Sequence, residues 1–171
     1  MKPKTGRMFS GTRRYHKFDI ATGQLETSIR LFLVEGCDMF SAVTLAAAAG
    51  EILHRLVLNA GKSPFVDYVI SVNDFRNPSK TPKRSSIISH IHKLLFINEL
   101  KHLDEKKEEF VEFDAEECAL AAILKAMSDY KTLTGKRTEA MTAFLAWTYQ
   151  NLDSAKIMEN YEKAPEEFKG G

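Results

Sequence analysis

The feature that most constrains this chain is an apolar, alanine-rich segment at residues 39–59. Its apolar residues recur every three or four positions, the spacing of one face of an α-helix. The alanines at 46–49 and Gly50 leave that face nearly flat, so that neighbouring helices can approach closely. Asp38 can cap the start of this helix, and Gly61 can end it. We therefore predict a core helix with the apolar stripe Ala42, Leu45, Ala46, Ala49, Ile52, Leu53 and Leu56.

A second helical pattern precedes this segment, at residues 22–35. Leu25, Ile29 and Phe32 recur on one side of it, and Gly36 occupies the C-terminal position that glycine favours. Because only a short connection separates the two patterns, an antiparallel helical hairpin is the most economical arrangement.

Three further helices are predicted, at residues 85–102, 114–133 and 138–152. Asp114 and Thr138 can cap the second and third of these. In the first, helical spacing places four apolar side chains toward the core: Ile87, Ile91, Leu94 and Leu95.

The remaining segments carry weaker patterns. Residues 65–75 fit either a short helix or an isolated extended segment, 77–82 have the composition of a loop, and 110–113 indicate a short extended piece. No alternating strand pattern is present. We predict an all-α fold, a compact bundle of about five helices that begins with the antiparallel hairpin and is preceded by a basic arm.

Composition narrows the class of protein. A chain of 171 residues with 44% hydrophobic and 27% charged residues has the size and balance of one globular domain. The longest apolar run, at residues 45–49, is much shorter than a membrane helix, and residues 1–17 lack the apolar core of a signal peptide. Cys37 and Cys118 indicate neither a disulfide scaffold nor a zinc site.

These observations predict three regions in the chain. Residues 1–18 form a flexible basic arm, residues 19–155 a single helical domain and residues 156–171 a C-terminal tail. We expect a cytoplasmic protein with no membrane partner, no metal and no cofactor.

The net charge of +1 hides a strong segregation of charge. Residues 1–17 and 76–93 contain basic residues and no acidic ones, whereas residues 104–117 are strongly acidic. Acid-free basic segments favour nucleic acid, because phosphate contacts release counterions. A solvated tail and a solvated loop account for the same pattern.

One polar block stands out at the end of the 85–102 helix. On an ideal helix Asn98 and His102 continue the stripe of positions 87, 91 and 94, and Lys101 lies beside them. As an active centre, Lys101 would bind a phosphate or another anion, His102 would transfer a proton and Asn98 would orient the reacting group. As a structural cluster, the same residues would cap the helix end. We expect all three side chains to meet at an accessible spot.

Two other pairs are weaker candidates. Arg84 and His90 are separated by five residues, a spacing that arises often by chance. Glu51 and His54 are expected to form a polar pair at the rim of the 39–59 helix rather than a ligand set.

Several blocks of the chain look like an uncharacterised family of small proteobacterial helical proteins. The similarity covers about residues 20–152, with matches at 24–33, 38, 41–49, 51–53, 98–104, 111–113, 133–135 and 143–145. The block at 98–104 carries that family's asparagine–x–x–lysine–histidine–x–aspartate pattern, which adds Asp104 to the candidate ligand-binding residues Arg84 and His90. At Val43 the chain departs from the pattern, which has a histidine there.

More distantly, the hairpin and the polar block resemble the HEPN superfamily of all-helical proteins. Many of its members are dimeric, metal-independent ribonucleases or toxins with an arginine and a histidine separated by four to six intervening residues, and Arg84 and His90 meet that spacing. The resemblance implies a homodimer, paired through the alanine-rich helix or Trp147, that binds RNA, a nucleotide or a phosphorylated ligand and has ribonuclease-type activity.

Two alternatives stay open. One is a non-enzymatic helical interaction module in which Asn98, Lys101 and His102 are structural. The other is a small-molecule binding bundle with a closed pocket near Asn98.

Overall fold

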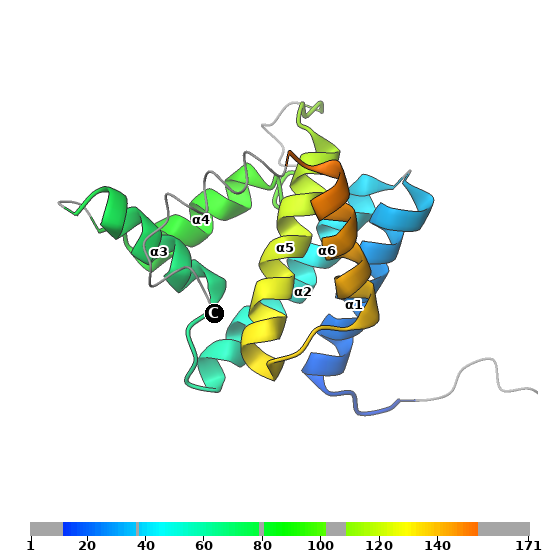
Figure 1. Ribbon diagram of the computed structural model, residues 1–171, viewed down its shortest axis with the longest axis horizontal. Coiled ribbons are helices and arrows are strands. Elements are labelled where there is room, and N and C mark those ends of the chain that lie inside the picture. Colours follow the sequence, from blue (N-terminus) through cyan, green and yellow to red (C-terminus); the bar gives the residue numbers. More distant parts are fainter. Residues whose placement is uncertain (1–11, 37, 79–80, 102–108, 154–171) are drawn as a thin grey trace, which may run out of the picture.

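The computed structural model describes residues 12–36, 38–78, 81–101 and 109–153. Helices are the only regular elements within these residues, which confirms the predicted all-α fold. The elements, in chain order, are α1 (Lys17–Arg30), the π-helical turn η1 (Leu31–Glu35) that continues it, α2 (Met39–Asn59), α3 (Phe65–Arg76), α4 (Arg84–Leu94), α5 (Ala115–Thr134) and α6 (Glu139–Asn151) (Figure 1).

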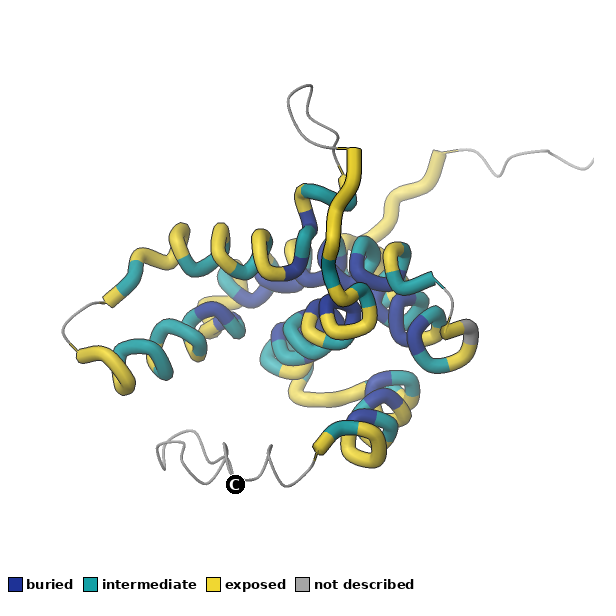
Figure 2. The backbone as a smooth tube through the Cα atoms, turned by 90° about the horizontal axis from the view of Figure 1, so that it is seen from above, coloured by how far each residue is buried: buried dark blue, intermediate teal, exposed yellow. Residues whose placement is uncertain are grey.

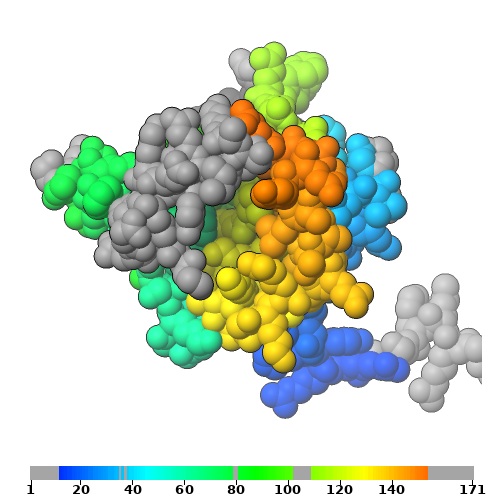
Figure 3. Space-filling view, viewed as in Figure 1, coloured from blue at the N-terminus to red at the C-terminus, as the bar shows by residue number. Residues whose placement is uncertain are grey.

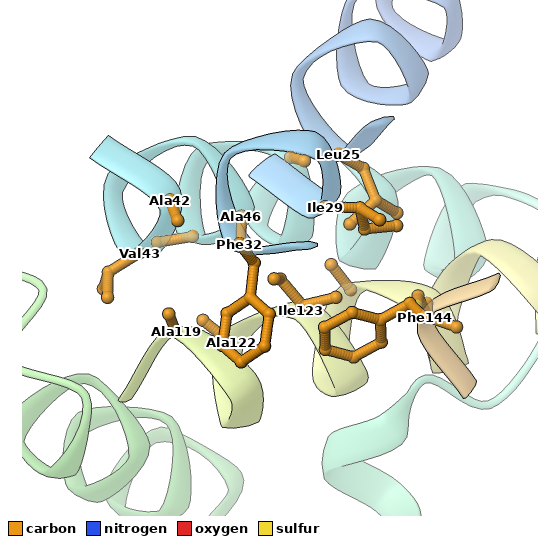
Figure 4. Close-up of a cluster of buried hydrophobic side chains, with 14 of the residues drawn as sticks. Leu25, Ile29, Phe32, Ala42, Val43, Ala46, Ala119, Ala122, Ile123 and Phe144 are labelled. Carbon is orange, nitrogen blue, oxygen red and sulfur yellow. The ribbon is translucent and has the colours of Figure 1, made fainter. Parts of the chain in front are cut away.

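The core surrounds α2, which packs along both α1 and α5. Ala42, Ala46 and Ala49 of α2 have no exposed surface, as the alanine-rich stripe predicts. Figure 4 shows Ala42 and Ala46 in one cluster with Leu25 and Ile29 of α1 and with residues of η1, α5 and α6. Because α1 and α5 cover the alanine face inside one chain, that face is not available as a dimer interface.

A buried side chain ties the N-terminal hairpin together. The hydroxyl of Ser28 in α1 donates a hydrogen bond of 2.7 Å to the carbonyl of Ala42 near the start of α2. The helices run in opposite directions, so the predicted antiparallel hairpin is confirmed (Figure 1). The first helix begins at Lys17 rather than at residue 22. His16 caps this start, because its side chain accepts a hydrogen bond from the amide of Phe18.

The predicted helix starts are largely correct, because local side chains specify them. Asp38, Asp114 and Thr138 each accept a hydrogen bond from the backbone N–H three residues on. Gly36 follows the first helix with a φ of 59°, a conformation that costs other residues more than glycine. Residues 65–75, which fitted a helix or an extended segment, belong to α3.

The predicted helix over residues 85–102 is wrong at its C-terminal end. It stops at Leu94, and Phe96 has a φ of 51°, so the chain turns away from the helix axis. Leu95 and Ile97 are thereby buried in the core, whereas Leu94, which was predicted to face inward, is 58% exposed. The burial of Leu95 and Ile97 accounts for the turn. The two residues are two positions apart, and a continued helix would point their side chains in different directions.

The α3 and α4 helices form a hairpin that extends away from the core. Buried residues are concentrated in α1, α2 and α5, whereas α3 and α4 are mostly half-buried or exposed (Figure 2). The tip of the hairpin also stands apart from α5 and α6 in the space-filling view (Figure 3). A cavity lies between α2 of the core and α4 of this hairpin.

By length and composition alone, α2 is apolar enough to cross a membrane. Half of its most apolar stretch is buried against the other helices, and a core helix meets the same two criteria.

Aromatic side chains join η1 to α6. The ring of Phe32 lies 4.8 Å from that of Trp147 and 5.2 Å from that of Phe144, both in edge-to-face geometry. Trp147 is half-buried in this contact.

Candidate functional site

A cavity of about 740 Å³ lies between α2 and α4, and residues of α1, α3 and α5 complete its wall. This volume is within the range of about 300–1,000 Å³ that small-molecule sites occupy. Much of the wall is apolar, with side chains from α2, α3 and α4: Ile52, Leu56, Leu58, Val66, Ile88 and Ile91.

The charged groups around the cavity are predominantly cationic. Among the described residues, one carboxylate lines it, that of Glu51. His54 and His92 also line it. The cationic side chains come from four different helices and are Lys17, Arg55, Arg84 and Lys125. This charge balance favours an anionic occupant.

Three titratable side chains with little exposed surface form what we call the inner cluster: His54 and Lys125, which line the cavity, and Asp129, which lies beside Lys125 and does not line it. His54 in α2 is 8% exposed, and Asp129 in α5 has no exposed surface. The ammonium of Lys125, one turn before Asp129 on the same helix, lies 3.9 Å from the Asp129 carboxylate at Oδ2. A methyl group at position 50 would lie 3.3 Å from Lys125 Nζ, so Gly50 in α2 leaves the space that this nitrogen occupies.

Asp129 is held in place by the start of α3. Its Oδ1 accepts a hydrogen bond of 2.7 Å from the backbone N–H of Phe65, the first residue of that helix. Pro64, at the N-cap position, supplies no side-chain cap. The carboxylate of a distant helix therefore satisfies one of the unpaired N–H groups of α3 and interacts favourably with its dipole.

Burial is the main influence on the pKa values of all three groups. It raises the pKa of Asp129, although the amide of Phe65 and the ammonium of Lys125 oppose that shift. It lowers the pKa of Lys125, against the attraction of Asp129 and Glu51. It also lowers the pKa of His54, an effect that Asp129 opposes and Lys125 reinforces. In each case desolvation favours the neutral form.

Two buried atoms of this cluster lack a hydrogen-bond partner among the described residues. They are Nδ1 of His54 and Oδ2 of Asp129. Buried polar atoms are normally satisfied, and His54 lines the cavity, so its unpaired Nδ1 offers a contact for a ligand. Perturbed titratable groups in a cavity are also typical of functional sites. Chemically, the cluster combines an amine, a carboxyl group and an imidazole.

Two ion pairs lie at the edge of the cavity. Arg84, at the start of α4, is paired with Asp67 of α3, so that the ion pair joins the two helices of the hairpin. Glu51 Oε1 lies 3.6 Å from Nζ of Lys101. The first pair orients a cavity-lining guanidinium, and the second partly neutralises the carboxylate that lines the cavity.

The structure gathers only part of the predicted site. Arg84 lines the cavity and Lys101 reaches its edge through Glu51, but Asn98 and His90 are exposed and do not line it. Because α4 ends at Leu94, the predicted continuation of its stripe through Asn98 is wrong, and Lys101 does not lie beside that stripe on a helix. The predicted residues that lie outside the described part of the chain are His102 and Asp104.

Sequence reasoning missed the inner cluster. His54, predicted at a rim with Glu51, is buried, and Lys125 and Asp129 were not singled out. The available signal was positional: on α5, positions 118, 122, 125 and 129 fall on one helical face, where two charged residues follow buried Cys118 and Ala122. Charged residues on a core face are rarely buried without a partner.

Comparison of the chain with protein-family models, curated proteins and solved structures finds no match in any of the three.

Proposed function

We propose that this protein binds a nucleotide or another small phosphorylated molecule in the cavity between α2 and α4. The observation that carries the proposal is the combination of a ligand-sized volume, an apolar wall and four cationic side chains in the lining. Of these four, Lys17 and Arg55 have no carboxylate partner among the described residues, whereas Arg84 and Lys125 are paired with Asp67 and Asp129. Phosphate groups pair well with guanidinium and ammonium groups, and a flat apolar base suits a wall of isoleucine and leucine.

Arg84 is the main candidate phosphate ligand. Its guanidinium is held by Asp67, so that binding would not have to order a free side chain. Arg55 and His92 supply further donors on α2 and α4. The predicted resemblance to HEPN proteins supports the same class of ligand, since many of those proteins act on RNA or nucleotides.

A small ligand is favoured over an RNA strand, because the cationic groups surround a cavity. RNA cleavage stays a prediction, as do the homodimer and the cytoplasmic location. Of the predicted arginine and histidine pair, Arg84 lines the cavity and His90 does not.

The test is equilibrium binding of nucleoside mono-, di- and triphosphates and of inorganic phosphate, measured by calorimetry. Arg84→Gln is expected to weaken nucleotide binding about tenfold, which corresponds to about 1.4 kcal/mol. Arg76→Gln is the matched control, because Arg76 is exposed on α3 and does not line the cavity. Equal binding by both variants, or no binding of any phosphate compound, would contradict the proposal.

A parallel titration with single-stranded RNA tests whether the ligand is RNA rather than a small phosphorylated molecule. Binding that falls steeply with salt and that nucleotides do not displace would assign the function to RNA and remove support for the small-ligand site.

The interaction-module alternative is supported by exposed apolar side chains at one end of the molecule. The ring of Phe113 lies 4.8 Å from Phe96 and 6.0 Å from Phe40, whereas Phe40 is 56% exposed and Phe110 is 86% exposed. Exposed aromatic groups of this kind are typical of protein-binding surfaces. The test is the substitution Phe40→Ser. If this variant keeps its stability and its nucleotide binding but no longer binds a protein partner, the result would favour the interaction module.

A further inference from the structure

We propose that Lys125 is a reactive amine, which forms an imine with the aldehyde or ketone group of a phosphorylated carbonyl compound seated in the cavity. The phosphate group of this compound rests on the proposed function, which gives the cavity an anionic ligand. The reactivity of the Lys125 amine rests only on the inner cluster of His54, Lys125 and Asp129.

The position of Lys125 supports this role. Its side chain is 14% exposed, and it lines the cavity from α5. Gly50 on the facing helix leaves space around Nζ that any larger residue would fill. Among the described residues the nitrogen has one ion-pair partner, Asp129, at a distance longer than a hydrogen bond. The amine is therefore both accessible from the cavity and weakly engaged.

The surroundings of Lys125 also favour its nucleophilic form. Burial lowers the pKa of its ammonium, so that more of the neutral amine is present near neutral pH. A lysine desolvated in an apolar pocket is a recognised way to activate an amine toward carbonyl groups. Lys62, by contrast, does not line the cavity, and its exposed ammonium donates hydrogen bonds to the carbonyls of Thr132 and Leu133.

Asp129 and His54 supply the proton transfers that imine formation needs. Burial favours the protonated carboxyl group of Asp129, and its Oδ2 faces Lys125 Nζ at 3.9 Å. The imidazole of His54 is the other buried titratable group beside the cavity, and its Nδ1 lacks a partner among the described residues. A carboxylic acid and an imidazole next to an amine form an acid–base set.

The reaction balances without an oxidant or a reductant. The lone pair of the neutral amine attacks the carbonyl carbon to form a C–N bond, and the carbonyl oxygen takes the proton of the Asp129 carboxyl group. The resulting ammonium proton moves through His54 to the new hydroxyl group, which leaves as water when the C–O bond breaks. The products are a protonated imine on Lys125, water and the Asp129 carboxylate. The positive imine and the negative carboxylate then form an ion pair, which offsets the cost of burying each charge.

The experiment treats the full-length protein at neutral pH with pyridoxal 5′-phosphate, an aldehyde with a phosphate group, and reduces the adduct with borohydride. Peptide mapping by mass spectrometry then measures the fraction of each lysine that is labelled. We expect Lys125, which lines the cavity, to be labelled at least about tenfold more than exposed Lys131 of the same helix. Lys125→Arg should abolish this label, and Lys131→Arg should leave it unchanged.

Pyridoxal without its phosphate separates this proposal from the proposed function. Preferential labelling of Lys125 by the phosphorylated aldehyde alone supports both. Equal labelling of Lys125 by the two aldehydes supports the reactive amine and contradicts selection for phosphate. Labelling of Lys125 no greater than that of Lys131 overturns the imine proposal, whatever the nucleotide titrations give. Because site mapping is made on the wild-type chain, the test does not depend on the stability of any variant.

Discussion

The carboxylate of Asp129 in α5 accepts the backbone N–H of Phe65, the first residue of α3, at 2.7 Å. The two residues are far apart in the sequence, and their hydrogen bond attaches the start of the α3–α4 hairpin to the core. The same carboxylate faces Lys125, so the anchor of the hairpin is also part of the inner cluster. The geometry of the cavity and its chemistry therefore depend on one buried side chain.

Replacement of Asp129 should separate its two contributions to stability. Asp129→Leu leaves the amide of Phe65 without an acceptor and Lys125 without its ion pair, and we expect a loss of about 3 kcal/mol in the free energy of unfolding. Asp129→Asn retains an oxygen that can accept from Phe65, so its loss should be about 1 kcal/mol. Urea denaturation monitored by circular dichroism measures both. Equal losses would mean that the hydrogen bond to Phe65 does not anchor α3.

Removal of the Lys125 charge should make stability depend on pH in a defined direction. The pKa of Asp129 in the folded state is above its usual value of 3.8. Between 3.8 and that raised pKa the folded state binds more protons than the unfolded state, so the protein loses stability as the pH rises. In Lys125→Met the ammonium that opposes the effect of burial on the Asp129 pKa is gone. His54 and the Phe65 amide still favour the charged carboxylate, whereas Asp67 disfavours it. We expect this variant to lose about 3 kcal/mol at about pH 8 and clearly less at about pH 5.

The control for that experiment is Lys131→Met, which removes an exposed charge from the same helix. Its stability should stay within about 0.5 kcal/mol of wild type at both pH values. A Lys125→Met loss that is the same at both pH values would contradict the burial of an unpaired carboxylate.

His54 should reduce stability under mildly acidic conditions. Burial lowers its folded pKa below the usual 6.5, with Lys125, Arg55 and Arg84 acting in the same direction and Asp129 opposing. The unfolded state then binds more protons in this window, so folding stability falls as the pH falls below 6.5. Between about pH 7.5 and about pH 5 the wild type should lose more stability than His54→Gln, by at most about 1.4 kcal/mol per pH unit. His90→Gln, which removes an exposed histidine, should follow the wild-type profile.

Ser28 should stabilise the N-terminal hairpin through its bond to Ala42. Ser28→Ala removes this buried hydrogen bond and should cost about 1 kcal/mol in chemical denaturation. Thr44→Ala is the matched control, because the Thr44 hydroxyl bonds to Phe40 within its own helix, and its effect should stay within about 0.5 kcal/mol. A comparable loss in the two variants would show that the contact between helices contributes nothing of its own.

Sequence reasoning succeeded where the determinants are local. The caps Asp38, Asp114 and Thr138 act on amides three residues away, and the alanine stripe of α2 repeats with the helical period. It failed at Leu94, where helical spacing predicted continuation and the burial of Leu95 and Ile97 required a turn. Spacing along one element describes which residues share a face, and it does not say which part of the core lies opposite.

The candidate site shows the same division. Arg84 could be found from the sequence, because it lies in an acid-free basic segment at a predicted helix start. His54 and Asp129 could not be paired, since nothing local to either residue indicates that α2, α3 and α5 converge there.

The amino-acid sequence by itself determined an all-helical chain, its helix starts and its alanine-rich core helix, because helical period and capping act over a few residues. Only the tertiary structure decided that His54, Lys125 and Asp129 meet beside a cavity and that α4 ends at Leu94. The physical reason is that desolvation and charge pairing depend on which helices pack together, and packing joins residues that the chain keeps far apart.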